Sequence, residues 1–154
     1  MTLDAGSKAP AFTAPADGGG TLSLSDFKGG PVVLYFYPKD ATSGCTKEAQ
    51  GFRDAYRRLK QAGGEVIGIP KDSVASHDRF KAKETLPFPL VSDADGTICA
   101  AYGTWTEKSL YGRKCMGIER ATFLIDGKGV VRRAWRKVKV PGHVDDVLAA
   151  VEAL

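Results

Sequence analysis

The 154-residue chain has few residues of the kinds that build disulfides and metal sites, with three cysteines and two histidines. A small, odd number of cysteines does not suit a disulfide framework, and these scattered residues form no cluster of metal ligands. No apolar run reaches the roughly eighteen residues of a membrane-spanning helix. We therefore expect no metal, no cofactor and no membrane partner.

The N-terminus also lacks the pattern of a secretory signal, because MTLDAGSKAPAF has neither a basic head nor an apolar core. Cysteines without an export signal are typical of the reducing cytoplasm, so we expect a cytoplasmic protein with reduced thiols. The length and the ordinary composition, 43% hydrophobic and 26% charged, favour a single domain over residues 1–154.

The net charge is only +4, and much of the basic excess lies in RRAWRKVK at residues 132–139. A basic patch beside Trp135 could bind nucleic acid. A strand with solvated charges on its open face explains the same pattern, and no other nucleic-acid motif accompanies it. We therefore expect no nucleic-acid partner.

Hydrophobic periodicity predicts alternating strands and helices. VVLYFY (32–37) is a continuous apolar run, typical of a central strand buried on both faces. From Cys45 onward apolar residues recur every three or four positions, as on one stripe of a helix, and Gly63-Gly64 ends that helix. The further expected elements are a strand at 65–69, a helix at 73–84, a short strand at 88–93, a short helix at 95–103, a hairpin at 121–135 and a closing helix at 142–154.

This order of elements also predicts how they are arranged. The strand at 65–69 follows the first strand through a helix, so the two are expected to be parallel with a right-handed crossover. The hairpin adds antiparallel strands. We therefore predict an α/β, thioredoxin-like fold: a mixed central β-sheet flanked by helices, with the segment up to Lys28 as an N-terminal hairpin extension.

Cys45 stands in the first turn of the expected long helix. Unpaired backbone N–H groups and the positive end of the helix dipole favour a thiolate there, and the thiolate is the nucleophilic form of cysteine. The stripe of apolar residues places Cys45 on the sheet-facing side, so the thiol is sheltered. A small buried residue at a helix start is the structural alternative.

The residues around Cys45 resemble a known family. Pro38, Thr42 and Cys45 form P-x-x-x-T-x-x-C, the peroxidatic signature of the peroxiredoxins. The likeness is greatest to the bacterioferritin comigratory protein, or PrxQ, branch and covers nearly the whole chain. The segments that carry it are GSKAPAF, SLSDFKG, YFYPKD, GCTKEAQGFRD, SHDRF, FPLVSD and GIERATFLID. It implies a thiol-dependent peroxidase for hydrogen peroxide and organic hydroperoxides.

The resemblance also implies a role for each matching residue. Cys45 would attack the hydroperoxide and become a sulfenic acid. Thr42 would hydrogen-bond the thiolate and the peroxide, Pro38 would keep solvent from the thiolate, and Arg120 would polarise the peroxide oxygens. The reductant would be a thioredoxin- or glutaredoxin-like protein or a small thiol, and the protein a monomer or a weak homodimer.

The chain departs from this branch at the resolving cysteine. Many relatives carry that cysteine where this chain has Gln50, and others carry it on the next helix, where this chain has Lys81. Cys99 is expected to be a packed core thiol. Cys115, in an expected exposed loop beside cations, is more available for exchange. We expect one-Cys-type turnover, with Cys115 (or Cys99) as resolving cysteine in the two-Cys alternative.

Other functions agree less well with the residues around Cys45. A disulfide oxidoreductase with this fold needs C-x-x-C, which is missing at Cys45, and a cysteine hydrolase needs a histidine base. His77 and His143 are expected to be surface or capping residues, unpaired with Cys45. The non-enzymatic alternative is a partner-binding thioredoxin-like module that acts through Trp105, Trp135 or the basic strand.

Overall fold

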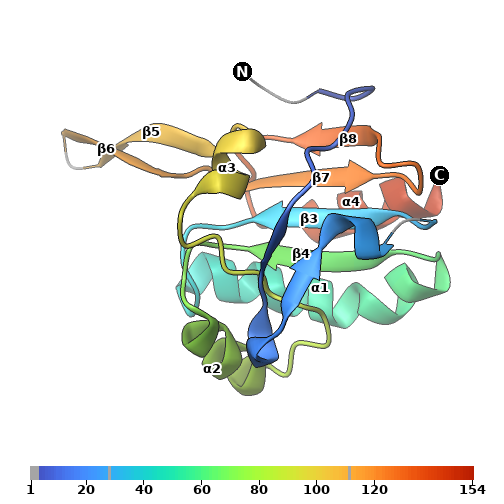
Figure 1. The fold of residues 1–154 in the computed structure, drawn as a ribbon, viewed down its shortest axis with the longest axis horizontal. Coiled ribbons are helices and arrows are strands. Elements are labelled where there is room, and N and C mark those ends of the chain that lie inside the picture. Colours follow the sequence, from blue (N-terminus) through green and yellow to red (C-terminus); the bar gives the residue numbers. More distant parts are fainter. Residues whose placement is uncertain (1–3, 28, 111) are drawn as a thin grey trace.

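The computed structural model describes residues 4–27, 29–110 and 112–154, and a mixed sheet forms its centre (Figure 1). The strand order is β4-β3-β7-β8. These strands are β3 (Val32–Phe36), β4 (Glu65–Ile69), β7 (Ala121–Ile125) and β8 (Val131–Trp135). β4 runs parallel to β3, whereas β7 runs antiparallel to both β3 and β8. The predicted mixed α/β sheet is therefore confirmed.

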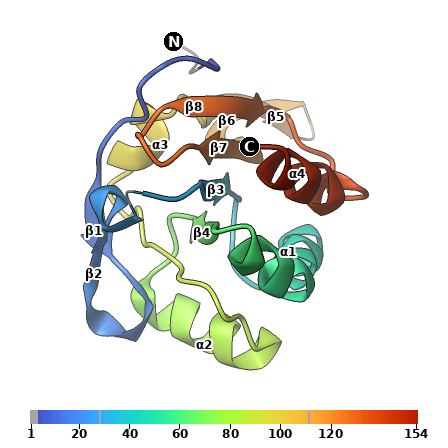
Figure 2. The same ribbon diagram turned by 90° about the vertical axis from the view of Figure 1, so that its right-hand side faces the viewer.

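Helices cover both faces of this sheet (Figure 2). α1 (Ser43–Gln61) and α4 (His143–Glu152) lie together on one face, and α2 (Val74–Glu84) lies beside the β4 edge. The other face carries the short α3 (Thr97–Ala101) and the N-terminal hairpin. The hairpin consists of β1 (Thr13–Pro15), the 3₁₀ turn η1 (Asp17–Gly19), β2 (Thr21–Ser23) and the 3₁₀ turn η2 (Leu24–Phe27).

The sheet separates two hydrophobic cores, because successive side chains of a strand point to opposite faces. Every residue of β3 is buried. Val33 and Tyr35 contribute to the core under α1 and α4, whereas Leu34 and Phe36 contribute to the core under α3 and the N-terminal hairpin. This central strand is thus held between the two cores, and the loop that leads to the start of α1 leaves from its end.

The predicted end of α1 and the predicted start of α2 are also confirmed. α1 ends before Gly63, which has a φ of +82°, and only glycine adopts such a conformation without strain. Ser73 caps α2, since its Oγ accepts a hydrogen bond from the Ser76 N–H at 3.1 Å. Within the described ranges, no helix is long and apolar enough to cross a membrane.

Two segments differ from the prediction. The expected strand at 88–93 shrinks to isolated bridges at Leu90 and Val91. The expected loop around Cys115 is instead part of a hairpin, β5 (Trp105–Leu110) with β6 (Arg113–Ile118), which extends away from the sheet (Figure 1). Its residues lack the apolar alternation of a half-buried strand, and among the hairpin residues whose burial is described only Ile118 is buried.

Candidate active site

Cys45 lies at the start of α1, close behind the C-terminal end of β3. It is the third residue of the helix and only 1% exposed. An N–H group in this position has no carbonyl partner within the helix. Thr42, the N-cap residue, directs its hydroxyl to the Lys39 carbonyl at 2.9 Å and makes no side-chain cap. The first turn of α1 therefore offers hydrogen-bond donors and positive potential to the thiol.

Arg120 connects this thiol to a carboxyl group. It stands between β6 and β7, and its Nη2 donates to the Sγ of Cys45 at 3.2 Å. Its Nη1 donates to Oε1 of Glu48 at 2.6 Å. Gly44 makes room for this contact, since a Cβ at that position would lie 3.2 Å from Nη2. One guanidinium thus bridges the thiol and the carboxyl.

Glu48 is a site residue that we did not predict. Its side chain is fully buried, and burial raises the pKa of its carboxyl to about 7, although Arg120 acts in the opposite direction. Its Oε2 has no hydrogen-bond partner among the described residues. The sequence contained a signal for this burial: Glu48 lies three residues after Cys45 and four before Phe52, on the same helical stripe.

Arg120 remains a cation at this position. Burial alone would lower its pKa, but the neighbouring Glu48 and Cys45 outweigh burial and raise the pKa above its ordinary value. The site therefore combines one permanent positive charge with two groups that can each carry a negative charge. Such an arrangement can stabilise a thiolate nucleophile and the negative charge that develops on a leaving oxygen.

A buried polar network fixes the loop that leads from β3 to α1. Asp40 accepts hydrogen bonds from the Tyr37 hydroxyl at 2.7 Å and from the Ser76 hydroxyl at 2.9 Å, and lies 2.6 Å from Nδ1 of His77. Nε2 of His77 lies 3.1 Å from the Val91 carbonyl. Both ring nitrogens of His77 therefore face oxygen acceptors, the Asp40 carboxylate and the Val91 carbonyl, and these two contacts fix the orientation of the ring.

The expectation that the two histidines lie at the surface is therefore wrong. His77 is fully buried in the ion pair with Asp40, and His143 is buried at the start of α4, where its Nε2 lies 2.7 Å from the Thr122 hydroxyl. Neither position follows from periodicity, because the polar partners come from distant parts of the chain. Both histidines contact other groups, so neither is positioned as a base for Cys45.

The other two cysteines occupy different surroundings. Cys99 is fully buried in the core on the opposite side of the sheet from Cys45, as expected of a packed core thiol. Burial and the Asp93 carboxylate raise the pKa of Cys99 to about 12. Cys115 pairs in register with Lys108 within the β5–β6 hairpin. The predicted exposure of the Cys115 side chain lies outside what the structure describes.

Both positions where a resolving cysteine was considered hold polar links between elements. Nε2 of Gln50 donates to Oε1 of Glu84 at 2.7 Å, which ties α1 to α2. Nζ of Lys81 donates to Oδ2 of Asp17 at 2.7 Å, which ties α2 to η1 of the N-terminal hairpin. These side chains therefore stabilise the packing of α2 where a thiol would otherwise stand.

Two remaining candidate residues lie at the surface. Pro38 is exposed in the loop after β3. Trp105 is 38% exposed on β5, with Nζ of Lys71 4.2 Å from its ring centroid. Arg132 and Arg133 of the basic segment point to solvent from β8, as expected of a strand with an open face.

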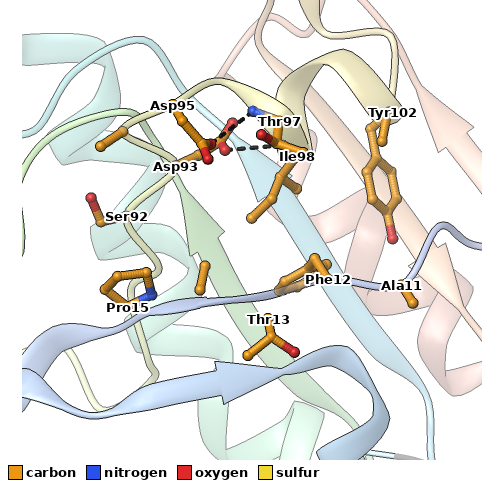
Figure 3. Close-up of a pocket in the computed structure, with 13 residues that line it drawn as sticks. Ala11, Phe12, Thr13, Pro15, Ser92, Asp93, Asp95, Thr97, Ile98 and Tyr102 are labelled. Carbon is orange, nitrogen blue, oxygen red and sulfur yellow. Dashed lines mark hydrogen bonds between the residues drawn. The ribbon is translucent and has the colours of Figure 1, made fainter.

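The pocket shown in Figure 3 lies away from Cys45. It is formed by the segment around β1 and by residues near α3, on the Cys99 side of the sheet. Asp93 and Asp95 at its rim accept hydrogen bonds from the N–H groups of Ile98 and Thr97. These carboxylates serve the turn into α3, so the pocket does not belong to the Cys45 site.

Comparison with known proteins agrees with this geometry. Residues 5–134 match the model of the AhpC/TSA family. The putative peroxiredoxin bcp of Coxiella burnetii is 56% identical over 148 residues, covering 96% of this chain and 98% of the relative.

Solved structures give the same relationship. A Xanthomonas campestris bacterioferritin comigratory protein, described for its alkyl peroxide reduction activity, has a TM-score of 0.88 and 46% identity over 92% of this chain and 90% of its own. A PrxQ mutant of Xylella fastidiosa has a TM-score of 0.94 and 39% identity, covering 99% and 98%. The chain therefore belongs to the AhpC/TSA family, within the peroxiredoxins of the bacterioferritin comigratory protein branch, which are thiol-dependent peroxidases.

Proposed function

We propose that Cys45 is the peroxidatic cysteine and that its oxidised form is reduced by an external thiol. The observation that carries the first part is the 3.2 Å contact between Nη2 of Arg120 and Sγ of Cys45 at the N-terminus of α1. The thiolate attacks the terminal oxygen of a hydroperoxide, the O–O bond breaks, and Cys45 becomes a sulfenic acid.

Ionisation of the thiol accounts for only part of the rate enhancement over an ordinary cysteine. An ordinary cysteine is already a few per cent thiolate near neutrality, so complete ionisation gains roughly 30-fold, or about 2 kcal/mol. A larger acceleration requires donors aimed at the breaking O–O bond. The donors we propose are Arg120, which contacts Sγ of Cys45, and the N–H of Cys45 in the first turn of α1.

Thr42 and Pro38 complete the proposed pocket. The Thr42 hydroxyl donates to the Lys39 carbonyl, which leaves its oxygen free to accept a hydrogen bond from the O–H of the incoming peroxide. Pro38 has no N–H and a fixed φ, so it holds the loop after β3 in one conformation near the entrance. The substrates we propose are hydrogen peroxide and organic hydroperoxides, in line with the alkyl peroxide reduction described for the Xanthomonas relative.

The second part of the proposal, one-Cys-type turnover, rests on the surroundings of Cys99, Gln50 and Lys81. The central sheet separates Cys99 from Cys45, and a thiol with a pKa of about 12 supplies almost no thiolate near neutrality. Gln50 and Lys81 are engaged in links between elements. The reductant is then a small thiol or a thioredoxin- or glutaredoxin-like protein.

A double variant tests this assignment. Cys99→Ser combined with Cys115→Ser is expected to consume peroxide with dithiothreitol at the rate of the unchanged protein, within about twofold. A small thiol reaches the sulfenic acid directly in one-Cys turnover, so neither of the replaced cysteines is needed. Accumulation of over-oxidised Cys45 in the double variant, with loss of turnover, would instead show that one of the two cysteines resolves the sulfenic acid.

A further inference from the structure

The buried carboxyl of Glu48 shares a single cation with the reactive thiol. Nη1 of Arg120 donates to Oε1 of Glu48 at 2.6 Å, while Nη2 of the same guanidinium donates to Sγ of Cys45 at 3.2 Å. If the thiol and the carboxyl were both ionised, this buried site would carry a net negative charge. Such a charge is costly where solvent is excluded, so ionisation of one group opposes ionisation of the other.

The surroundings of Glu48 favour its neutral form while Cys45 is a thiolate. The Glu48 side chain is fully buried, and its Oε2 has no hydrogen-bond partner among the described residues. A carboxylate oxygen without donors is poorly stabilised, which favours the protonated acid. Burial accordingly raises the pKa of Glu48 to about 7 in spite of Arg120.

Two neighbouring titratable groups are neutral near pH 7, whereas the Asp40 carboxylate, which also acts on Tyr35, is engaged by Tyr37 and Ser76. Tyr35 on β3 has a buried hydroxyl without a described partner, and burial, followed by the charge of Glu48, raises its pKa well above the ordinary value. Burial lowers the pKa of His143 on α4 to about 4, and the charge of Arg120 acts in the same direction. The charge of the site is therefore divided among Cys45, Arg120 and Glu48.

We propose that Glu48 is the proton store of the peroxide step, a positioning residue that acts through Arg120. It holds a proton while Cys45 is a thiolate and releases it when Cys45 is oxidised. An S–O bond forms to the terminal oxygen of ROOH, the O–O bond breaks, and the electron pair leaves on RO⁻. The sulfenic acid keeps the hydroxyl hydrogen, RO⁻ gains one proton to become ROH, and Glu48 loses one.

The reductive half of the cycle restores the proton. Two thiol molecules convert the sulfenic acid to the thiolate, forming one disulfide and one water, and the remaining proton returns to Glu48. In both halves the site keeps the same total charge, because a negative charge passes between Cys45 and Glu48 on either side of Arg120. A buried site thus avoids a change of charge that would require reorganisation of its surroundings.

The inference rests on the proposed reaction of Cys45 and is tested by counting protons. The protein is mixed with one equivalent of hydrogen peroxide in weakly buffered solution with a pH indicator. Thiolate loss is followed by ultraviolet absorbance, and sulfenic acid is measured by trapping. At about pH 6, the unchanged protein is expected to take up clearly less than one proton from solution for each thiolate that is oxidised. Glu48→Gln is expected to take up one for each.

The dependence on pH provides a second readout that needs no variant. Below about pH 7 Glu48 carries the proton and supplies it, whereas above that value Glu48 is already ionised and the solvent supplies it. The proton deficit of the unchanged protein is therefore expected to disappear as the pH rises through 7. Glu152→Gln, a matched change at an exposed ion pair with Arg58, is expected to behave like the unchanged protein.

The results distinguish failure of the proposed role of Glu48 from failure of the proposed function. One proton taken up per thiolate consumed by the unchanged protein at about pH 6 would overturn the role of Glu48. So would a proton deficit that stays constant as the pH rises through 7. Absence of trapped sulfenic acid on Cys45 would overturn the proposed function itself.

Discussion

Cys45 and Cys99 are almost equally buried, 1% and 0% exposed, on opposite faces of one sheet, yet their neighbours carry opposite charges. Arg120 donates to the sulfur of Cys45. Burial and the Asp93 carboxylate raise the pKa of Cys99 to about 12. Burial alone therefore does not distinguish the two thiols. They differ in the sign of the nearest charge, and the cation beside Cys45 is what the proposed thiolate nucleophile requires.

The two helix starts differ in the same way. Asp93 accepts hydrogen bonds from the N–H groups of Ile98 and Cys99 at 3.0 and 2.8 Å, so the beginning of α3 is already neutralised by a carboxylate. At the beginning of α1, Thr42 directs its hydroxyl to the Lys39 carbonyl instead. The donors of α1 are therefore left for the thiolate and the substrate of the proposed reaction.

Replacing each of the two cysteines by serine should give the largest difference in peroxidase activity. Cys45→Ser is expected to reduce peroxide consumption with dithiothreitol to the uncatalysed background, since the nucleophile is lost. Cys99→Ser is expected to retain the rate within about twofold, because Cys99 lies across the sheet. Retention of activity in Cys45→Ser would contradict the central role of this residue.

The second largest difference is expected in the alkylation rates of the two thiols in the reduced, folded protein. With a pKa of about 12, Cys99 is thiolate in only on the order of 10⁻⁵ of the molecules at neutral pH. We expect iodoacetamide to modify Cys99 only after unfolding, whereas Cys45 reacts in the folded state. Peptide mass spectrometry gives both rates, and modification of Cys99 as fast as Cys45 would show that the difference in charge has no chemical consequence.

Removal of the cation beside Cys45 is expected to cost less than removal of the thiol. Arg120→Ala should slow peroxide reduction by roughly 10²-fold, as is usual when a preorganised donor to a transition state is lost. Stopped-flow rates and the ultraviolet absorbance of the thiolate measure the two effects separately. A loss of rate fully explained by lost thiolate would contradict the role of Arg120 at the O–O bond. Arg120→Lys, which keeps the charge but not the two-sided contact, shows how much depends on geometry.

The smallest expected effect concerns the aspartate that fixes the loop before Cys45, the counterpart of Asp93 before Cys99. Asp40→Asn removes the charge paired with His77 and should cost about 2 kcal/mol of unfolding free energy. Urea unfolding measures this cost. Asp54→Asn, at an exposed pair with Arg53, is the control and should change stability by less than about 0.5 kcal/mol.

The contact between Asp40 and His77 should also make the stability of the protein sensitive to acid. Burial would raise the pKa of Asp40, but hydrogen bonds from His77, Tyr37 and Ser76 outweigh burial and lower it below 3.8. The carboxylate therefore contributes its full stability above pH 3.8, and this contribution is lost as the pH falls through the folded-state pKa. Asp40→Asn should lack this part of the acid sensitivity; equal acid sensitivity in both proteins would argue against a stabilising ion pair.

The sequence predicted those parts of the fold that depend on local patterns. The apolar run of β3 and the stripe of α1 identified both elements that place Cys45, and a glycine marked the end of α1. The β5–β6 hairpin was missed because it extends away from the core and carries little apolar alternation. Strand pairing without burial leaves a weak pattern in a sequence.

The candidate site was predicted only in part, for a related reason. Arg120 entered through the family resemblance, and the structure places it against Cys45. Glu48 could have been found from the helical stripe, because it lies three residues after Cys45 and four before Phe52, but we predicted no role for it. The pairing of Asp40 with His77 joins residues 37 positions apart, and no spacing along the chain predicts such a contact.

The most direct test of the account is the mass of the intact protein after one equivalent of peroxide in the absence of reductant. We expect Cys45 to gain one oxygen atom and to be trapped as a sulfenic acid, with Cys99 and Cys115 still alkylatable after unfolding. A monomer that has lost two hydrogens through an intramolecular disulfide between Cys45 and either cysteine would contradict one-Cys-type turnover.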